Sequence, residues 1–313
     1  MDIGSAYDAQ AGQVIIREVG LRDGLQMVSQ YPATQEKKEW MRRELSAGVR
    51  HIEVGSFLPA RHYPQFADVK DLVSNEDLIG VHKSALTMNE RGISDAFNTN
   101  ISEIVCVVSA TEEHSQRNMK RSQDASLDLI SFAKSLHEER DKILIAVAIP
   151  MSFGCSISGN VKPENVATLA ETCVKNGAEL LIIADTVGFA GPNNIRVVLE
   201  NIRATGISTP ISLHLHDTRG LGLANAAAAM DEGIYIFDSS IGGLGGCPFA
   251  PGATGNVVTE DLVFLCERMG FETGIDLQAL MCIREFVEST MPNEMFHGKL
   301  SIAGPPPTIE WSN

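Results

Sequence analysis

The sequence contains no apolar run close to the roughly 18 residues that are needed to cross a bilayer, so we expect no membrane-spanning segment. Its first residues, MDIGSAYDAQAGQ, lack the basic start and apolar stretch of a secretory signal, and also the arginines of a transit peptide. Only six cysteines occur in 313 residues, and without close pairing they do not make a disulfide framework. These absences predict a cytoplasmic protein.

Basic residues are also in short supply. The chain carries 25 Lys and Arg against 40 Asp and Glu, a formal net charge of −15. Such a charge disfavours binding to nucleic acid or anionic membranes, and an anionic substrate would need a local cationic site. Two phosphate-binding patterns are missing as well, because no GxGxxG follows the first apolar segment and GxxxxGK[ST] does not occur. Nucleotide-binding open sheets are therefore not expected.

What the sequence does contain is a regular alternation of short apolar segments with helix-like segments. Near-continuous apolar runs such as LLIIA indicate strands that are buried on both faces, as in a parallel sheet. Hydrophobic periodicity predicts helices over 34–47, 123–139, 163–176 and 193–204. We expect the strands at 14–19, 51–57, 79–86, 103–109, 143–149, 179–184, 211–216 and 234–239.

Eight strand–helix units without a break in composition favour a closed (β/α)8 TIM barrel over an open sheet. We expect a single TIM-barrel domain over residues 1–313, with the barrel at about 14–275 and an additional C-terminal helix and tail at 276–313. In such a barrel the active site lies at the C-terminal ends of the strands. Polar residues at those ends are therefore the candidates for function.

The first strand leads into a polar turn. In VIIREVGLRDGLQ, the residues Glu18, Arg22, Asp23 and Gln26 lie at or just beyond the strand end. Arg-Asp-Gly is also common in solvated turns, so the motif alone leaves a functional and a purely local role open. Arg22 and Gln26 are candidate substrate-binding residues.

Two histidines end the seventh strand, in SLHLHDT. Because side chains alternate along a strand, His214 and His216 point to one face, and Leu213 and Leu215 to the other. With the leucines against the helices, both imidazoles face the barrel mouth. A lone histidine is usually structural, but an aligned pair at a strand end is typical of metal ligands.

A long glycine-rich loop, SSIGGLGGCPFAPGATGN, follows the eighth strand. It holds six glycines between Gly242 and Gly255, with Cys247 inside it and Asn256 at its end. It is either a flexible surface loop or, at the catalytic face of a barrel, a lid or an anion cradle. Apart from Cys155, Cys247 is the cysteine outside the strand and helix patterns, and so the best candidate for an accessible thiol.

Two more strand ends carry candidates, Glu53 in HIEVGSF and Asp185 with Thr186 in IIADTVG. A carboxylate at the end of a buried strand is costly unless it is paired, so each should face a cation. We expect Glu53 to orient Arg22, Asp185 to orient a ligand water or the substrate, and Thr186 to bind substrate. Two imidazoles, a carboxylate and an amide oxygen suit Mg2+ or Mn2+ better than a structural zinc.

The motifs as a set resemble those of the hydroxymethylglutaryl-CoA lyase family, within the barrel metallolyases. The matching segments are EVGLRDGLQ, IEVGSF, ADTVG, HLHDT and GGLGGCPFAPGATGN, and the likeness covers nearly the whole chain, from about residue 14 to 288. RDG and HxH are shared across the superfamily. GLGGCP with its downstream GN is much more specific to the lyases.

The resemblance implies a divalent cation, Mg2+ or Mn2+, held by Asp23, His214, His216 and Asn256. It also implies a retro-Claisen cleavage of an acyl-CoA substrate to acetyl-CoA and a keto acid. In that reaction the cation lowers the pKa of the C3 hydroxyl, and breakage of the C2–C3 bond expels a thioester enolate.

The resemblance further implies the roles of the catalytic residues. Arg22 would stabilise the enolate as its charge develops. Glu53 and Asp185 are further catalytic candidates on the ground of their predicted positions rather than of the resemblance. Cys247 would close over the site, and either this thiol or a water linked to a histidine such as His214 would protonate the enolate.

Three mouth segments depart from the family pattern, namely Met27-Val28-Ser29, Asn118-Met119-Lys120 and Ser156-Ile157-Ser158-Gly159. They lie where the acyl group and CoA should bind. We therefore expect the substrate to be 3-hydroxy-3-methylglutaryl-CoA or a closely related 3-hydroxyacyl-CoA.

Two alternatives stay open at this point. A Claisen-condensing synthase uses the same bond chemistry, but such synthases commonly carry a further domain after the barrel. A barrel that has lost catalysis and serves as a binding protein should lack a ligand or Arg22, and all are present. Barrel lyases of this kind often form homo-oligomers, and the apolar helix near 277–290 could pack on a partner or on its own barrel.

Overall fold

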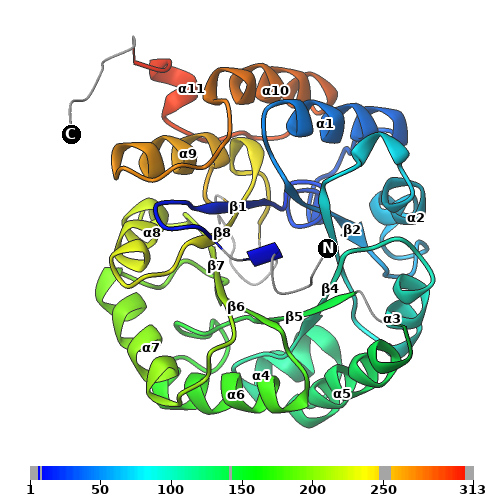
Figure 1. Ribbon diagram of the computed structural model, residues 1–313, viewed down its shortest axis with the longest axis vertical. Coiled ribbons are helices and arrows are strands. Elements are labelled where there is room, and N and C mark those ends of the chain that lie inside the picture. The colour runs from blue at the N-terminus through cyan, green and yellow to red at the C-terminus, as the bar shows by residue number, and fades with distance from the viewer. Residues whose placement is uncertain (1–5, 8, 141–142, 247–254, 307–313) are drawn as a thin grey trace.

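Eight parallel strands form a closed barrel. The structure, a computed structural model, describes residues 6–7, 9–140, 143–246 and 255–306. The strands pair in chain order and β8 pairs with β1, with helices in a ring outside them (Figure 1). The predicted TIM barrel is confirmed. The strands are β1 (Ile15–Glu18), β2 (His51–Ser56), β3 (His82–Leu86), β4 (Glu103–Val107), β5 (Leu144–Ile149), β6 (Leu180–Asp185), β7 (Ile211–Leu215) and β8 (Ile236–Ser239).

The helices follow the strands in the chain. The four that periodicity predicts are found with ends within one residue of those expected. Pro163 and Pro192 each stand at the first helical position, where a missing N–H costs nothing. The α-helices are α1 (Thr34–Ser46), α2 (Val69–Val73), α3 (Glu90–Phe97), α4 (Glu112–His114), α5 (Gln123–Arg140), α6 (Pro163–Asn176), α7 (Pro192–Ala204), α8 (Gly222–Asp231), α9 (Thr259–Arg268), α10 (Leu277–Thr290) and α11 (Leu300–Ala303).

The predicted start of the third strand is wrong. The strand was expected from residue 79, but β3 begins at His82. Residues Glu76–Leu78 form a short 3-10 helix, and Gly80 adopts a φ of 88°, which turns the chain before the strand. Ile79 is 88% exposed. Its β-branched side chain is typical of a strand, but the residue lies outside β3.

The strands build two apolar layers, as β6 illustrates. All six of its residues are buried. Leu181 and Ile183 belong to the large core cluster that includes the helices. Leu180 and Ile182 belong to a second cluster, made mainly of barrel strand residues. This alternation is the geometry of a strand covered on both faces, and the barrel interior is therefore packed.

Tyr7 packs against one end of the barrel. The ring of buried Tyr7 contacts the rings of His51 and His82 at centroid distances of 5.1 and 5.4 Å, and its hydroxyl donates a hydrogen bond to Glu103. His51, His82 and Glu103 are the first residues of their strands. Tyr7 therefore lies at the end of the barrel opposite the C-terminal ends, where active sites lie.

The predicted C-terminal helix, α10, lies beside α1 and α9 (Figure 1). Its Arg284 donates hydrogen bonds to the carboxylate of Glu260, at 3.2 Å, and to the carbonyl of His297. The amide of His297 in turn donates to the carbonyl of Gly242 at 2.7 Å. The C-terminal segment is thus bonded to the first residues of the glycine-rich loop.

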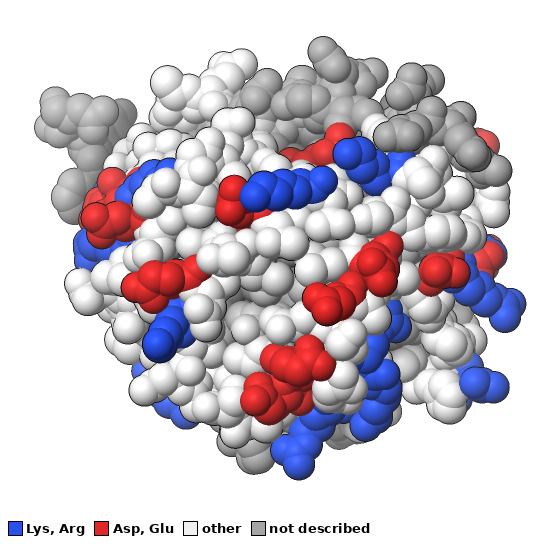
Figure 2. Space-filling view, turned by 90° about the horizontal axis from the view of Figure 1, so that it is seen from below, with Lys and Arg blue, Asp and Glu red and all other residues white. Residues whose placement is uncertain are grey.

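The surface of the barrel carries charges of both signs. On the side seen in Figure 2, acidic and basic side chains are interspersed rather than separated into large patches. Among the described residues, no helix has the length and apolar composition required to span a membrane.

Candidate active site

A tight turn after β1 presents Arg22 and Asp23 to the barrel mouth. The carbonyl of Val19 accepts hydrogen bonds from the amides of Arg22, Asp23 and Gly24 at 3.1, 2.8 and 3.2 Å. Because three successive amides share the carbonyl of Val19, the chain makes a tight turn here. The 3-10 helix Gly24–Gln26 continues this turn. Both side chains line the central cavity.

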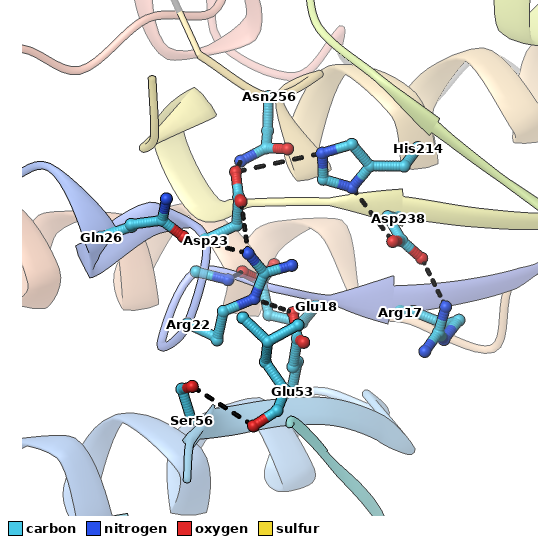
Figure 3. Close-up of polar contacts among 12 residues, drawn as sticks. Arg17, Glu18, Arg22, Asp23, Gln26, Glu53, Ser56, His214, Asp238 and Asn256 are labelled. Carbon is cyan, nitrogen blue, oxygen red and sulfur yellow. Dashed lines mark hydrogen bonds and ion pairs between the residues drawn. The ribbon is translucent and has the colours of Figure 1, made fainter. Parts of the chain in front are cut away.

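Arg22 is held in place by three side chains (Figure 3). Its Nε donates to Oε2 of Glu53 at 2.7 Å, and its Nη1 donates to Oδ1 of Asp23 at 2.6 Å and to Oε1 of Gln26 at 3.3 Å. The predicted contact between Glu53 and Arg22 is present. Burial raises the pKa of Glu53, although the adjacent guanidinium opposes that rise.

The two histidines of the seventh strand point together into the cavity, as their alternation predicts. The Nε2 atoms of His214 and His216 lie 3.0 Å apart, and they lie 4.0 and 3.7 Å from Oδ2 of Asp23. One ligand atom from each of the three residues lies within 4.8 Å of the others. Such converging nitrogen and oxygen atoms are what a divalent cation requires.

Asn256 completes the cluster from the far end of the glycine-rich loop. Its Nδ2 donates to Oδ2 of Asp23 at 2.8 Å and to the carbonyl of Leu244 at 2.9 Å. Its Oδ1 is buried and has no hydrogen-bond partner in the described structure, whereas buried polar atoms normally have one. An amide oxygen, two imidazoles and a carboxylate therefore fit a divalent cation such as Mg2+ or Mn2+. That these four residues bind one stays a prediction.

Neighbouring charges set the protonation of the cluster. Burial alone would raise the pKa of Asp23, but the Arg22 guanidinium and the two imidazoles outweigh it and hold that pKa well below its usual value. Burial alone would lower the pKa of His214, yet its hydrogen bond to Asp238 and the charge of Asp23 raise it instead. The carboxylate of Asp23 is therefore charged and able to act as a ligand at neutral pH.

The structure adds two buried residues that the sequence did not reveal. Asp238, in β8, lies with its Oδ2 3.1 Å from Nδ1 of His214. Its Oδ1 accepts a hydrogen bond from Nη1 of Arg17, in β1, at 2.9 Å (Figure 3). Charged residues inside otherwise apolar strands were the available signal, but the strand register across the barrel was needed to show that they meet.

The cavity has one polar and one apolar side. The polar side carries the residues described above, together with Thr186. The strands from β3 to β6 supply the apolar side, and the parallel register places Ala184 of β6 beside His214. Among the apolar lining residues are Leu86, Val105, Val107, Ala148, Ile182 and Ala184.

Asp185 does not have the cationic hydrogen-bond partner that we expected. Its two carboxylate oxygens accept hydrogen bonds from the backbone amides of Phe189 and Ala190, at 2.8 and 3.0 Å. The carboxylate is therefore satisfied by the turn that follows β6. Thr186 does line the cavity, and its Oγ1 accepts the amide N–H of Met151 at 2.9 Å, which leaves its hydroxyl proton available. Their roles in binding and catalysis stay predictions.

The glycine-rich loop is pinched at its base. A Cβ on Gly245, whose φ is 126°, would lie 2.5 Å from Nδ2 of Asn256 and 3.2 Å from Oδ2 of Asp23. Only glycine lets the chain pass this close to the two side chains. The predicted thiol, Cys247, lies outside the described residues.

A family model and two curated proteins each match most of the chain. A family model described as HMGL-like matches residues 13–287. Hydroxymethylglutaryl-CoA lyase YngG of Bacillus subtilis is 36% identical over 282 residues, which are 89% of this chain and 93% of that protein. An (R)-citramalyl-CoA lyase of Chloroflexus aurantiacus is 37% identical over 292 residues, covering 89% and 91%.

A solved structure extends the likeness to three dimensions. It is an HMG-CoA lyase from Acinetobacter baumannii in complex with coenzyme A and 3-methylmalate, with a TM-score of 0.89 and 30% identity. The match covers 97% of this chain and 99% of that one.

Proposed function

Because this chain belongs to the hydroxymethylglutaryl-CoA lyase family and is, like the relatives named above, a carbon–carbon lyase, we propose that it cleaves 3-hydroxy-3-methylglutaryl-CoA or a closely related 3-hydroxyacyl-CoA. The products would be acetyl-CoA and a keto acid. The observation that carries this proposal is the convergence of Arg22, Asp23 and the two histidines on one cavity.

Asp23, His214, His216 and Oδ1 of Asn256 would hold a divalent cation, which we propose to be Mg2+ or Mn2+. When bound, such a cation polarises the substrate oxygens that it contacts. The chain orients the donors for this purpose. The Nδ2 of Asn256 is bonded to Asp23 and to a backbone carbonyl, so its Oδ1 is the atom left to face the cation.

Arg22 would stabilise the negative charge that develops during cleavage. A base removes the proton of the C3 hydroxyl, the C2–C3 bond breaks as the C3 carbonyl forms, and the electron pair of that bond moves into the thioester as an enolate. Within the described residues Nε and Nη1 of Arg22 are bonded to Glu53, Asp23 and Gln26, while Nη2 makes no hydrogen bond. That Nη2 is therefore available to the enolate oxygen, and a donor already in position needs no rearrangement.

A proton must then reach C2 to give acetyl-CoA. Cys247 is the proposed acid, because its loop begins and ends at the site: Gly246 lines the cavity, and Asn256 lies against Asp23. A thiol between those two points would close over the substrate. Cys247 itself is outside the described residues, so the proposal is supported by the sequence motif and by the positions of Gly246 and Asn256.

The apolar side of the cavity fits the acyl end of such a substrate. Ala184 stands beside His214, and the next inward row consists of Val107, Ala148 and Ile182, paired across three strands. In both acyl-CoAs that the relatives' names give, the carbon with the hydroxyl also bears a methyl group. We propose that this methyl group packs against Ala148 and its neighbours. These apolar side chains could not form a hydrogen bond with a polar substituent in the same place.

A citramalyl-CoA is the second candidate substrate. The Chloroflexus relative that acts on it is 37% identical to this chain, and the segments around Met27, Asn118 and Ser156 differ from the hydroxymethylglutaryl-CoA pattern. Asn118 lines the cavity, so at least one of these differences would meet the substrate.

The test is a coupled assay for acetyl-CoA release from each acyl-CoA, with Mg2+, with Mn2+ and after chelation. Cation-dependent release from 3-hydroxy-3-methylglutaryl-CoA supports the first candidate. Release only from citramalyl-CoA supports the second. No release from either, by protein that binds Mn2+, would refute both substrates while leaving the metal site in place.

A further inference from the structure

A buried arginine crosses the barrel interior behind the metal cluster. Arg17 lies in β1, and its side chain is 3% exposed. Its Nη1 donates to Oδ1 of Asp238 in β8 at 2.9 Å, and its Nη2 donates to Oε1 of Glu103 in β4 at 2.6 Å. β4 and β8 stand opposite each other in the closed strand order. Arg17 therefore spans the barrel and fixes a carboxylate on each side.

The carboxylate on the β8 side reaches the predicted metal ligand. The Oδ2 of Asp238 lies 3.1 Å from Nδ1 of His214, and Nε2 of the same ring faces His216 and Asp23. A carboxylate that accepts the Nδ1 proton keeps Nε2 unprotonated and available, and it also fixes the rotation of the ring. Asp238 can do so only if its own side chain is held still.

We propose that Arg17 is the positioning residue for His214, acting through Asp238. Oδ1 of Asp238 is held by Arg17 and by the hydroxyl of Ser212, at 3.2 Å, which leaves Oδ2 directed at the imidazole. Without the guanidinium, Asp238 would keep one neutral donor and would be free to rotate. This inference rests on the metal site of the proposed function and assigns a task to a residue outside that site.

Glu103, the second carboxylate bonded to Arg17, is also fixed by several hydrogen bonds. Glu103 is fully buried and also accepts hydrogen bonds from the hydroxyl of Tyr7 and, at 2.9 Å, from Nε2 of His82. The ring of Tyr7 lies 5.6 Å from the guanidinium carbon of Arg17. Glu103 thus has three partners and is a rigid anchor. A continuous chain of hydrogen bonds therefore runs from Tyr7 through Glu103, Arg17 and Asp238 to His214.

A role in packing alone makes a different prediction. If Arg17 only neutralises two buried carboxylates, its replacement should lower stability and leave the cluster unchanged in the folded protein. If it positions His214, its replacement should also weaken cation binding and alter the ligand geometry. The two effects are measured separately, because affinity is determined on folded protein at a temperature below unfolding.

The experiment measures Mn2+ affinity from the free-ion EPR signal, and the visible spectrum of bound Co2+, in the full chain. Arg17→Lys keeps the positive charge. Lysine has a single side-chain nitrogen, however, whereas arginine uses Nη1 for Asp238 and Nη2 for Glu103. We expect its Mn2+ dissociation constant to rise roughly fivefold, and that of Asp238→Asn to rise about 10- to 100-fold, the range for partners of metal-ligating histidines. Both should shift the Co2+ absorption bands.

Two further variants make the result interpretable. Glu103→Gln loosens Arg17 from the far side without touching Asp238, and it should also weaken Mn2+ binding by a few-fold. It carries the test if Arg17→Lys does not fold. Lys37→Met is the matched control, since it removes a buried ion pair with Asp68 in which no residue of the cluster takes part. It should lower stability and leave Mn2+ affinity and the Co2+ spectrum unchanged.

The outcomes separate the inference from the proposed function. Unchanged Mn2+ affinity and Co2+ spectra in both Arg17→Lys and Glu103→Gln would overturn the positioning role. Absence of Mn2+ binding in the unaltered protein would instead refute the metal site itself, and with it the ground on which the positioning role stands.

Discussion

The amide nitrogen of Asn256 donates a hydrogen bond of 2.8 Å to Oδ2 of Asp23, although 233 positions separate the two residues in the chain. This contact orients both groups at once. It directs Nδ2 of Asn256 toward a carboxylate, so that Oδ1 is left without a hydrogen-bond partner in the described structure and is available to the proposed cation. It also brings the end of the glycine-rich loop against the turn after β1.

Replacing Asn256 by alanine should therefore weaken cation binding. The variant loses one oxygen ligand and the donor that orients Asp23, and we expect a rise in the Mn2+ dissociation constant of about tenfold or more. Isothermal titration with Mn2+ measures it. Asn201→Ala is the control, because the Asn201 side chain donates to the carbonyl of Val197 in its own helix and, among the described residues, makes no other hydrogen bond. Equal affinities in the two variants would contradict the ligand role.

Arg22→Lys should be severely impaired in turnover. Lysine cannot bond to Glu53 and Asp23 while also presenting a separate nitrogen to the substrate, because it lacks the planar fork. We expect kcat to fall about 100- to 1,000-fold, the range for loss of an oxyanion donor. Steady-state kinetics on the acyl-CoA that the coupled assay selects would measure this. A kcat within a few-fold of the original would remove Arg22 from the enolate step.

Cys247→Ser should bind Mn2+ normally and turn over slowly. A hydroxyl is a far weaker acid than a thiol, so protonation of the enolate should become slower while the ligands stay unaltered. The measurement is kcat beside Mn2+ affinity in the same preparation. Full activity of the serine variant would show that another group supplies the proton.

Ala148→Leu should impair substrate use without affecting the cation. Ala148 lines the apolar side of the cavity, and the larger side chain occupies the space proposed for the C3 methyl group. We expect KM to rise and Mn2+ affinity to stay constant. Ala148→Gly, which adds no volume, should retain most of the activity. Unchanged kinetics in the leucine variant would place the methyl group elsewhere.

Stability should decrease between about pH 5 and 8, partly because of Glu18. Burial raises the pKa of this carboxyl to about 8, in spite of hydrogen bonds from Thr259, Ile241 and Gly20. The folded chain keeps this proton above the pH at which the unfolded chain releases it, so the stabilisation is complete at low pH and is lost as pH rises through that range.

Glu18→Gln isolates this contribution, because the amide is neutral at every pH. The slope of the unfolding free energy against pH, measured by urea denaturation between pH 6 and 7.5, should become shallower by about one proton. Other buried carboxyls, such as Glu260 with a pKa raised by burial to about 7, keep some slope in both proteins. Identical slopes would mean that Glu18 is ionised in the folded state.

The sequence predicted those parts of the site that depend on local geometry. Alternation along β7 is enough to place His214 and His216 on one face. Glu53 was expected at a strand end, but it is the third residue of β2 and bonds to Arg22 from within the strand. The strand boundaries followed from apolar runs to within two residues, except at the start of β3, where a turn at Gly80 precedes the strand.

What the sequence could not supply was contact across the barrel. Arg17, Glu103 and Asp238 lie on three strands, and their meeting depends on the stagger between strands rather than on spacing along any one of them. The partners of Asp185 were equally hidden, since they are backbone amides whose direction is set by the turn after β6. A residue type reveals that a charge needs compensation but does not identify the group that provides it.

The closure between β1 and β8 has a consequence for how the protein becomes active. Asp23 follows the first strand, whereas His214, His216 and Asn256 come from the last two strand–loop units, so the donors lie on both sides of this seam. A cation held by all four, as we propose, would link the first and last units of the barrel, and its binding free energy would add to the stability of the closed form alone. During synthesis these four residues can come together only after Asn256, and with it almost the whole barrel, has been made. The proposed cation site would therefore exist only in the completed fold.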